Sequence, residues 1–92
     1  WLHAADGLAA GLADRARWQE TIDVCQAILQ RDECWEQAYR LLMLAHARLG
    51  NRAQALRTYQ RCIERLREEL DVPPSAATVQ LLATLRGAAG QP

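Results

Sequence analysis

The chain resembles itself when its sequence is shifted by about 34 residues, a period typical of a helix–turn–helix unit. Leu8 then pairs with Leu42, and Ile28 pairs with Cys62, so apolar side chains recur at matching positions. A unit of this kind cannot bury its apolar face alone. Neighbouring units stack and share a continuous core. The period therefore predicts consecutive antiparallel helix pairs.

The spacing of apolar residues within each unit also indicates helices. Trp18, Ile22 and Cys25 recur at the spacing of one helix face. No segment shows the sustained alternation of polar and apolar residues that marks a half-buried strand. We expect five helices, at about 2–14, 18–30, 34–49, 52–70 and 76–86.

Residues that cap or break helices mark the ends of these segments. Asp32 and Ser75 are the expected N-caps of the third and fifth helices. Gly50 is expected to end the third helix because glycine readily adopts a positive φ. Pro73 and Pro74 cannot continue the fourth helix. Residues 1–86 are then one domain, and residues 87–92 are expected to form a flexible tail.

The second unit fits the pattern of the tetratricopeptide repeat, whereas the first is degenerate. In the first unit Ala16 stands at the turn glycine and Thr21 at the small alanine. We therefore expect an all-α fold in which antiparallel helix hairpins stack as a tetratricopeptide-like, right-handed array, with a generic helical bundle as the alternative. The positions that fit in the second unit are Tyr39, Leu42, Gly50, Ala55 and Tyr59.

Charge and composition argue against several functional classes. Eleven basic and eleven acidic residues cancel, whereas a nucleic-acid-binding surface usually needs a basic excess. No apolar run approaches the roughly 20 residues that span a bilayer. Cys25, Cys34 and Cys62 form no CxxC pair, so we interpret them as packing side chains rather than disulfides or metal ligands. Free thiols of this kind indicate a reducing compartment, here the cytoplasm.

Two runs in the second half of the chain are more specific than the repeat pattern. One extends from Ala38 to Met43 and the other from Glu69 to Ser75. Together they resemble the bacterial transcriptional activation domain of Streptomyces antibiotic regulatory proteins and of larger multidomain regulators that carry an ATPase module. The resemblance covers residues 16–85, with Asp71 where glycine is usual.

The resemblance implies that the chain regulates transcription through protein contacts rather than by binding DNA itself. It also implies that the N-terminal helices of a complete domain are missing, since the chain opens at Trp1 within an expected helix. A general tetratricopeptide scaffold unrelated to transcription is the alternative function.

A concave wall made by the first helix of each hairpin is the expected binding surface. Arg40 and Arg48 are expected to hold a carboxylate or an acidic segment of a partner. The alternative is that both are ordinary solvated arginines. Counting repeat positions places these side chains on the wall: His3, Asp6, Ala10, Gln37, Arg40, Leu44 and Arg48.

The expected partners are proteins, namely other domains of the parent regulator, the transcription machinery or a second copy. Trp1, Leu2 and Leu8 form an apolar patch that predicts a homodimer at high concentration. We expect no direct contact with nucleic acid or a membrane, although the arginines of the fourth helix are an alternative nucleic-acid surface. Acidic residues in the same helix offset the positive charge of these arginines.

An enzymatic function is the remaining alternative. A dyad of Cys62 and His46 can be drawn in the repeat register. Packing explains both residues, because His46 falls at a core-facing repeat position and Cys62 lies on an apolar stripe. Nothing in the sequence resembles a phosphate-binding loop or a pair of catalytic carboxylates. We therefore expect no catalytic residue, cofactor or metal ion.

Overall fold

The computed structural model describes the backbone of residues 1–90 and the side chains of residues 1–87, and this part of the chain is all-helical. The prediction of an all-α fold is confirmed. None of these helices combines the length and the apolar character needed to cross a membrane. The helices are α1 (Leu2–Asp14), α2 (Trp18–Arg31), α3 (Glu36–Arg48), α4 (Arg52–Leu70) and α5 (Ala76–Gly90).

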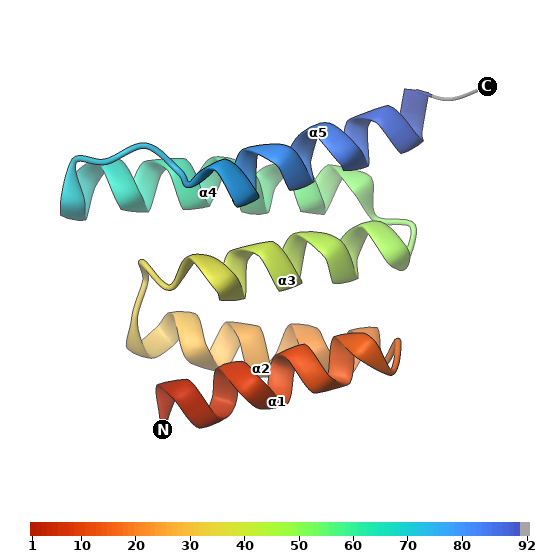
Figure 1. Cartoon of the computed structure of the whole chain (residues 1–92), viewed down its shortest axis with the longest axis horizontal. Coiled ribbons are helices and arrows are strands. Elements are labelled where there is room, and N and C mark those ends of the chain that lie inside the picture. Colours follow the sequence, from red (N-terminus) through yellow and green to blue (C-terminus); the bar gives the residue numbers. More distant parts are fainter. Residues whose placement is uncertain (91–92) are drawn as a thin grey trace.

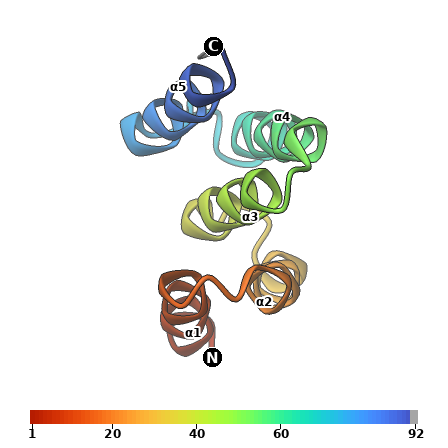
Figure 2. The same cartoon turned by 90° about the vertical axis from the view of Figure 1, so that its right-hand side faces the viewer.

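The helices pack in neighbouring antiparallel pairs. α1 pairs with α2 and α3 pairs with α4, and α2 also packs closely on α3 (Figure 1). In the end-on view of Figure 2, α1 and α5 lie on one side and α2 and α4 on the other, with α3 between them. α1, α3 and α5 run in the same direction, and α3 contacts both of the others. This is a tetratricopeptide-like array, whose right-handed sense stays a prediction.

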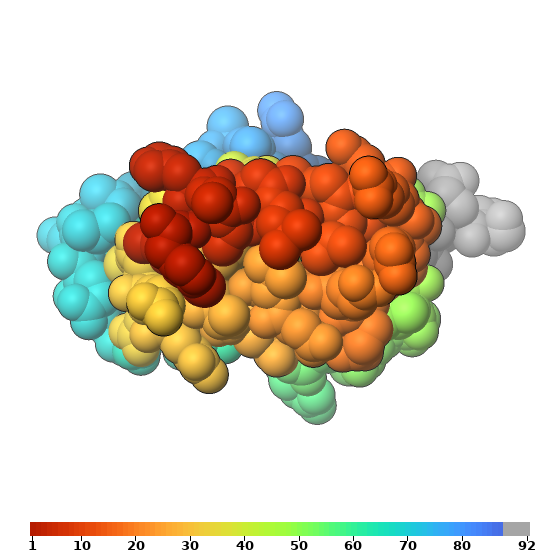
Figure 3. All heavy atoms as spheres, turned by 90° about the horizontal axis from the view of Figure 1, so that it is seen from below, coloured from red at the N-terminus to blue at the C-terminus, as the bar shows by residue number. Residues whose placement is uncertain are grey.

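The apolar core lies along α2, α3 and α4, and α1 covers it from one end of the stack (Figure 3). Ile28 and Tyr39 are among the largest side chains that are completely buried. The Tyr39 hydroxyl donates a 2.6 Å hydrogen bond to the carbonyl of Glu33, so its buried polar atom is satisfied. Burial raises the pKa of Tyr39 to about 12. The core therefore holds a neutral phenol at physiological pH.

Equivalent turns of the two hairpins use the same backbone conformation with different residues. Gly50, between α3 and α4, has φ +82°, and Ala16, its counterpart in the first hairpin, has φ +57°. The left-handed region suits glycine and strains alanine. Asn51 then caps α4 by accepting a hydrogen bond from the backbone N–H of Gln54 at 3.3 Å. The degenerate turn therefore keeps the geometry of the regular one.

The end of α4 explains the departure from the family pattern at Asp71. This residue is the C-cap and adopts the left-handed conformation, with φ +54°. Glycine is the usual residue at such a cap, and Asp is among the few others that visit the conformation routinely. The substitution therefore preserves the turn that leads to Pro73 and Pro74.

Two helix boundaries differ from the sequence-based expectation. α3 begins at Glu36 rather than at residue 34, because Asp32 stabilises a turn: its side chain accepts the Cys34 N–H at 2.9 Å, and its carbonyl accepts the Trp35 N–H at 3.3 Å. α5 continues past the expected end at Arg86 and runs to Gly90, while the flexibility expected of the tail stays a prediction. Alanine favours the helix there. Residues 91 and 92 of the expected tail lie outside the described residues.

Candidate protein-interaction face

The seven side chains expected on the concave wall fall into three separate places. His3 and Asp6 lie on the seam between α1 and α3. The His3 ring meets Trp35 edge to face with centroids 5.3 Å apart, and the Trp35 indole N–H donates to the Asp6 carboxylate at 3.0 Å. These two residues therefore bind α1 to the start of α3. Ala10, further along α1, is half-buried.

Gln37 and Arg40 belong to a polar cluster that joins α3 to the start of α5. Arg40 donates to the Gln37 side chain at 2.8 Å and to the Thr78 hydroxyl at 3.1 Å. Glu36 is the centre of the cluster and accepts from the Ser75 N–H at 3.0 Å, the Ser75 hydroxyl at 2.8 Å and the Thr78 hydroxyl. The expected role of Arg40 toward a partner is therefore taken by contacts within the chain.

The balance of forces on Glu36 keeps it ionised. Burial alone would raise the pKa of this carboxyl, but hydrogen bonds from Thr78 and Ser75, together with the charge of Arg40, outweigh it. The pKa of Glu36 therefore lies below its ordinary value of 4.5. The Arg40 guanidinium lies 3.6 Å from the carboxylate, so the cluster carries no net charge when Glu36 is ionised.

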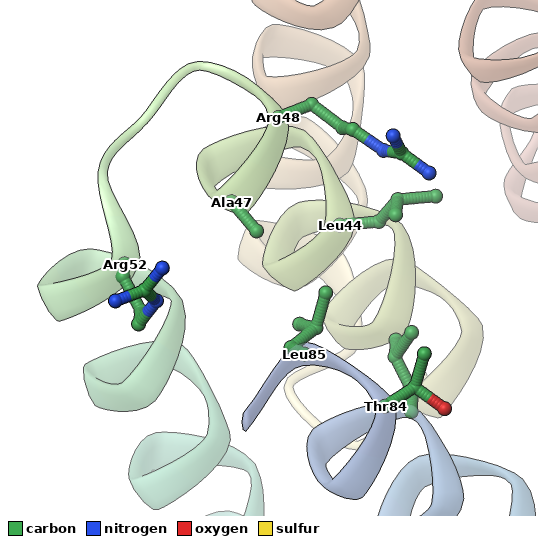
Figure 4. A pocket seen from close by; sticks show the side chains of 7 residues that line it. Leu44, Ala47, Arg48, Arg52, Thr84 and Leu85 are labelled. Carbon is green, nitrogen blue, oxygen red and sulfur yellow. The ribbon is translucent and has the colours of Figure 1, made fainter. Parts of the chain in front are cut away.

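Leu44 and Arg48 meet at a pocket between the end of α3, the start of α4 and the second half of α5. Figure 4 shows Arg48 and Arg52 on opposite sides, with Ala47 and Leu85 between them. The pocket has a volume of about 240 Å³. Two of the expected wall residues thus border a hollow in the surface. Its lining is Leu44, Ala47, Arg48, Arg52, Leu81, Thr84 and Leu85.

The pocket lies in a seam that is looser than its counterpart in the first repeat. α2 packs closely on α3, whereas the described residues of α4 and α5 make little contact. The α2 side chains in the first seam are buried, and their equivalents in the second repeat, on α4, are only half-buried. The pairs are Ile22 and Leu56, Cys25 and Tyr59, and Leu29 and Ile63.

His46 lies in the last turn of α3 and Cys62 lies within α4, and no hydrogen bond joins them among the described residues. The charged groups that influence Cys62 are Glu36 and Arg40, near the start of α3. His46 lies six residues beyond Arg40, which is about 9 Å further along the helix axis. Burial raises the pKa of the Cys62 thiol to about 12 and lowers the pKa of His46. Burial therefore keeps the Cys62 thiol protonated at neutral pH, and the protonated thiol is not the nucleophilic form.

The expected patch of Trp1, Leu2 and Leu8 is only partly apolar surface. Leu8 is 56% exposed, because Ala5 and Ala9 supply the buried face of α1. Leu2 packs against the core, and the Trp1 ring lies under the guanidinium of Arg31 at 4.3 Å.

Sequence reasoning missed the residues that α5 contributes. Ser75 was expected only as a cap, yet it and Thr78 reach Glu36 on α3. Leu81 and Leu85 form one side of the pocket. The sequence does contain a signal for this contact: Glu36 lies at the start of α3, and Ser75 lies at the start of α5. Only the stacking of the helices, which the sequence does not specify, brings these two ends together.

Comparison with known proteins agrees with the resemblance. A search of curated proteins and a search of solved structures gave no match. The family model described as the bacterial transcriptional activator domain matches residues 2–86. This match spans all four helices of the two hairpins and most of α5. The chain therefore belongs to the bacterial transcriptional activator domain family.

Proposed function

We propose that the domain acts in transcription as a protein-interaction module, through its helical surfaces rather than by contacting DNA. The observation that carries this proposal is the pocket between α3, α4 and α5. There Leu44 and Arg48, two side chains expected on the binding wall, border an open apolar hollow. Protein interfaces are typically anchored by side chains of one partner that fill a pocket on the other. The partners we propose are other domains of the parent regulator, the transcription machinery or a second copy, in the cytoplasm.

Two arginines of α4 support the choice of protein over DNA, because they are already engaged within the chain. Arg65 lies 2.9 Å from Glu68 and 3.6 Å from Glu33, and Arg61 lies over the ring of Tyr39. A phosphate backbone would have to compete with these contacts, and affinity for DNA depends on cations that are free to replace counterions.

A tethering experiment tests the proposal. The chain is fused to an unrelated DNA-binding domain, and transcription is measured from a promoter that carries the matching operator. We expect activation that is lost in the double variant Leu44→Asp, Arg48→Glu and retained in the control Arg15→Glu. Arg15 is exposed and makes no side-chain hydrogen bond or ion pair with a described residue. A folded fusion that never activates would favour a general scaffold unrelated to transcription.

DNA binding is tested directly with the isolated chain. In a mobility-shift assay with duplex DNA at low salt, we expect no shift at concentrations that saturate a protein partner. A tight, salt-dependent shift would contradict the proposal.

We also propose that the domain catalyses no reaction. Its thiols provide the test, because the thiolate is the reactive form and a pKa of about 12 leaves almost none at neutral pH. We expect Cys62 to react with an aromatic disulfide reagent only as fast as the fold opens. Rapid modification of Cys62 in the native domain, dependent on His46, would restore the enzymatic alternative.

A further inference from the structure

We propose that the pocket between α3, α4 and α5 binds an acidic segment of a partner protein that carries aliphatic side chains. An aliphatic group enters the hollow, and flanking carboxylates pair with Arg48 and Arg52. This inference rests on the proposed function, since it names the chemistry of the partner at the same face.

The lining of the pocket selects the apolar part of the ligand. Leu44 of α3 and Leu81 and Leu85 of α5 supply apolar walls, and Ala47 leaves space between them. A hollow of about 240 Å³ lies below the usual range of roughly 300–1,000 Å³ for small-molecule sites. It suits one or two aliphatic side chains of a peptide, which anchor an interface when they fill a pocket near its centre.

The two repeats differ at the first residue of the second helix of each hairpin. The position equivalent to Arg52 in the first repeat is occupied by Trp18, whose indole packs against the core. The first repeat therefore has a half-buried aromatic ring at the position where the second repeat has an exposed guanidinium beside the pocket.

The charge of the surrounding chain selects the acidic part of the ligand. Residues 37–63 include no Asp or Glu, and residues 72–87 include none either. The pocket is lined entirely from these two segments. Within the described residues, Arg48 and Arg52 form no ion pair, unlike Arg17, Arg40 and Arg65. The arginines in the two segments are Arg40, Arg48, Arg52, Arg57, Arg61 and Arg86.

The start of α4 adds to this positive potential. Its first turn contains no acidic residue, so the partial positive charge of the helix N-terminus is not neutralised there by the chain's own carboxylates. Arg52 is the first residue of the helix. A carboxylate at the mouth of the pocket would therefore interact with a guanidinium and with the helix end, and charge-assisted contacts of this kind are the stronger hydrogen bonds.

The apolar lining of the pocket favours an acidic peptide over nucleic acid as its ligand. A phosphate backbone would use the arginines but gain nothing from Leu44, Leu81 and Leu85. An acidic–aliphatic peptide uses both features of the pocket.

The test measures binding of a short fluorescein-labelled peptide of alternating Asp and Leu to the complete chain by fluorescence anisotropy. We expect binding that weakens at least about tenfold when the Asp residues become Asn, and equally when the Leu residues become Ser. High salt should weaken binding of the acidic peptide and leave any residual binding of its Asn version unchanged.

Variants of the chain locate the site. The double variant Arg48→Ala, Arg52→Ala should bind the acidic peptide at least about tenfold more weakly, and the matched control Arg15→Ala should bind it normally. Arg52→Trp, which copies the first repeat, should also abolish binding. Circular dichroism confirms that each variant is folded. Binding that survives in both pocket variants would overturn the proposal.

Two further outcomes would assign the pocket to another occupant. Leucine-independent binding of a duplex oligonucleotide that requires Arg48 and Arg52 would overturn the proposal in favour of nucleic acid. Concentration-dependent sedimentation that disappears in the double variant would overturn it in favour of a second copy.

Different experimental outcomes would contradict the proposed function and the proposed peptide site. A tethered domain that activates transcription regardless of Arg48 and Arg52 would keep the function and overturn the peptide site. A domain that binds the peptide through both arginines but never activates transcription would keep the site and overturn the function.

Discussion

The seam between α2 and α3 and the seam between α4 and α5 occupy equivalent places in successive repeats, yet they are built differently. The first is closed by buried apolar residues such as Ile22 and Leu29. The second makes little contact along its length, and α5 is held instead through its contact with α3, which includes the polar cluster around Glu36. The same repeat geometry therefore gives a closed apolar contact in one place and a loosely packed contact, with a pocket beside it, in the other.

The two contacts differ because the first buries apolar area and the second forms hydrogen bonds that replace bonds to water. Burying apolar area contributes roughly 25 cal/mol per Å² and needs no exact partner. Hydrogen bonds to a charged group contribute roughly 1.5–3 kcal/mol, and removing one partner lowers the free energy of unfolding because the other partner is left unsatisfied. The docking of α5 should therefore depend on a few specific atoms, whereas the packing of α2 on α3 depends on many.

The largest effect should come from the closed part of the core. Tyr39→Ala removes a completely buried ring and should lower the free energy of unfolding by about 3–5 kcal/mol. Urea denaturation followed by circular dichroism measures the change. The control Tyr39→Phe loses only the hydrogen bond to Glu33 and should cost about 1 kcal/mol. Equal losses in the two variants would contradict the role assigned to the ring.

The next effect should be confined to the open seam. Glu36→Ala leaves Ser75, Thr78 and Arg40 without their shared partner, which should cost about 1–3 kcal/mol. Hydrogen exchange should become faster in α5 and remain unchanged in α2. Faster exchange throughout the chain would show that the two seams open together.

Glu20→Ala is the matched control for Glu36→Ala. The pair of Arg17 and Glu20 is 2.7 Å apart, but both side chains are more than half exposed. Exposed pairs of this kind contribute about 0–1 kcal/mol. We expect no change in the exchange of α5.

A smaller effect extends the comparison to the turns of the two hairpins. Ala16→Gly relieves the left-handed strain that Gly50 avoids in the second hairpin and should stabilise the domain by about 1 kcal/mol. Gly50→Ala is the reciprocal change and should destabilise it by a similar amount. Thermal unfolding of the two variants measures both. A loss of stability in Ala16→Gly would mean that the strain is compensated by packing.

The smallest effect should appear on acidification. Because the pKa of Glu36 is lowered in the folded state, its contribution is complete above the ordinary value of 4.5 and is lost as the pH falls through the folded pKa. Docking of α5 should therefore weaken in acid. The effect is partial, since a protonated carboxyl still accepts hydrogen bonds from Ser75 and Thr78. Hydrogen exchange of α5 in Glu36→Gln should lose this pH dependence.

The sequence predicted the helices and hairpins because their signals are local. The apolar stripes of α2 and α4 and the breaks at Gly50 and Pro73 depend only on neighbouring residues. α1 and α5 are rich in alanine and have no sharp apolar stripe, so their buried faces could not be assigned. Val79 of α5 is one example: it is apolar and yet 45% exposed.

The candidate site was predictable only on the side of α3. Leu44 and Arg48 follow from repeat counting, because the wall of an array recurs with the repeat. The contribution of α5 and the polar cluster depend on how one helix settles on another, which a sequence period does not determine. Arg40 was therefore assigned to a partner when its nearest groups are Gln37, Glu36 and Thr78.

The three tryptophans all lie in the N-terminal half of the molecule, away from the seam between α4 and α5. Trp1 lies under Arg31, Trp18 packs on the core and Trp35 is bonded to Asp6, so all three belong to the α1–α3 part of the molecule. Their ultraviolet emission should therefore report mainly on the α1–α3 part of the molecule. A titration in which α5 detaches and unfolds should lower the helical ellipticity while the emission wavelength changes little, so ordinary optical spectroscopy can separate the two contacts without any added label.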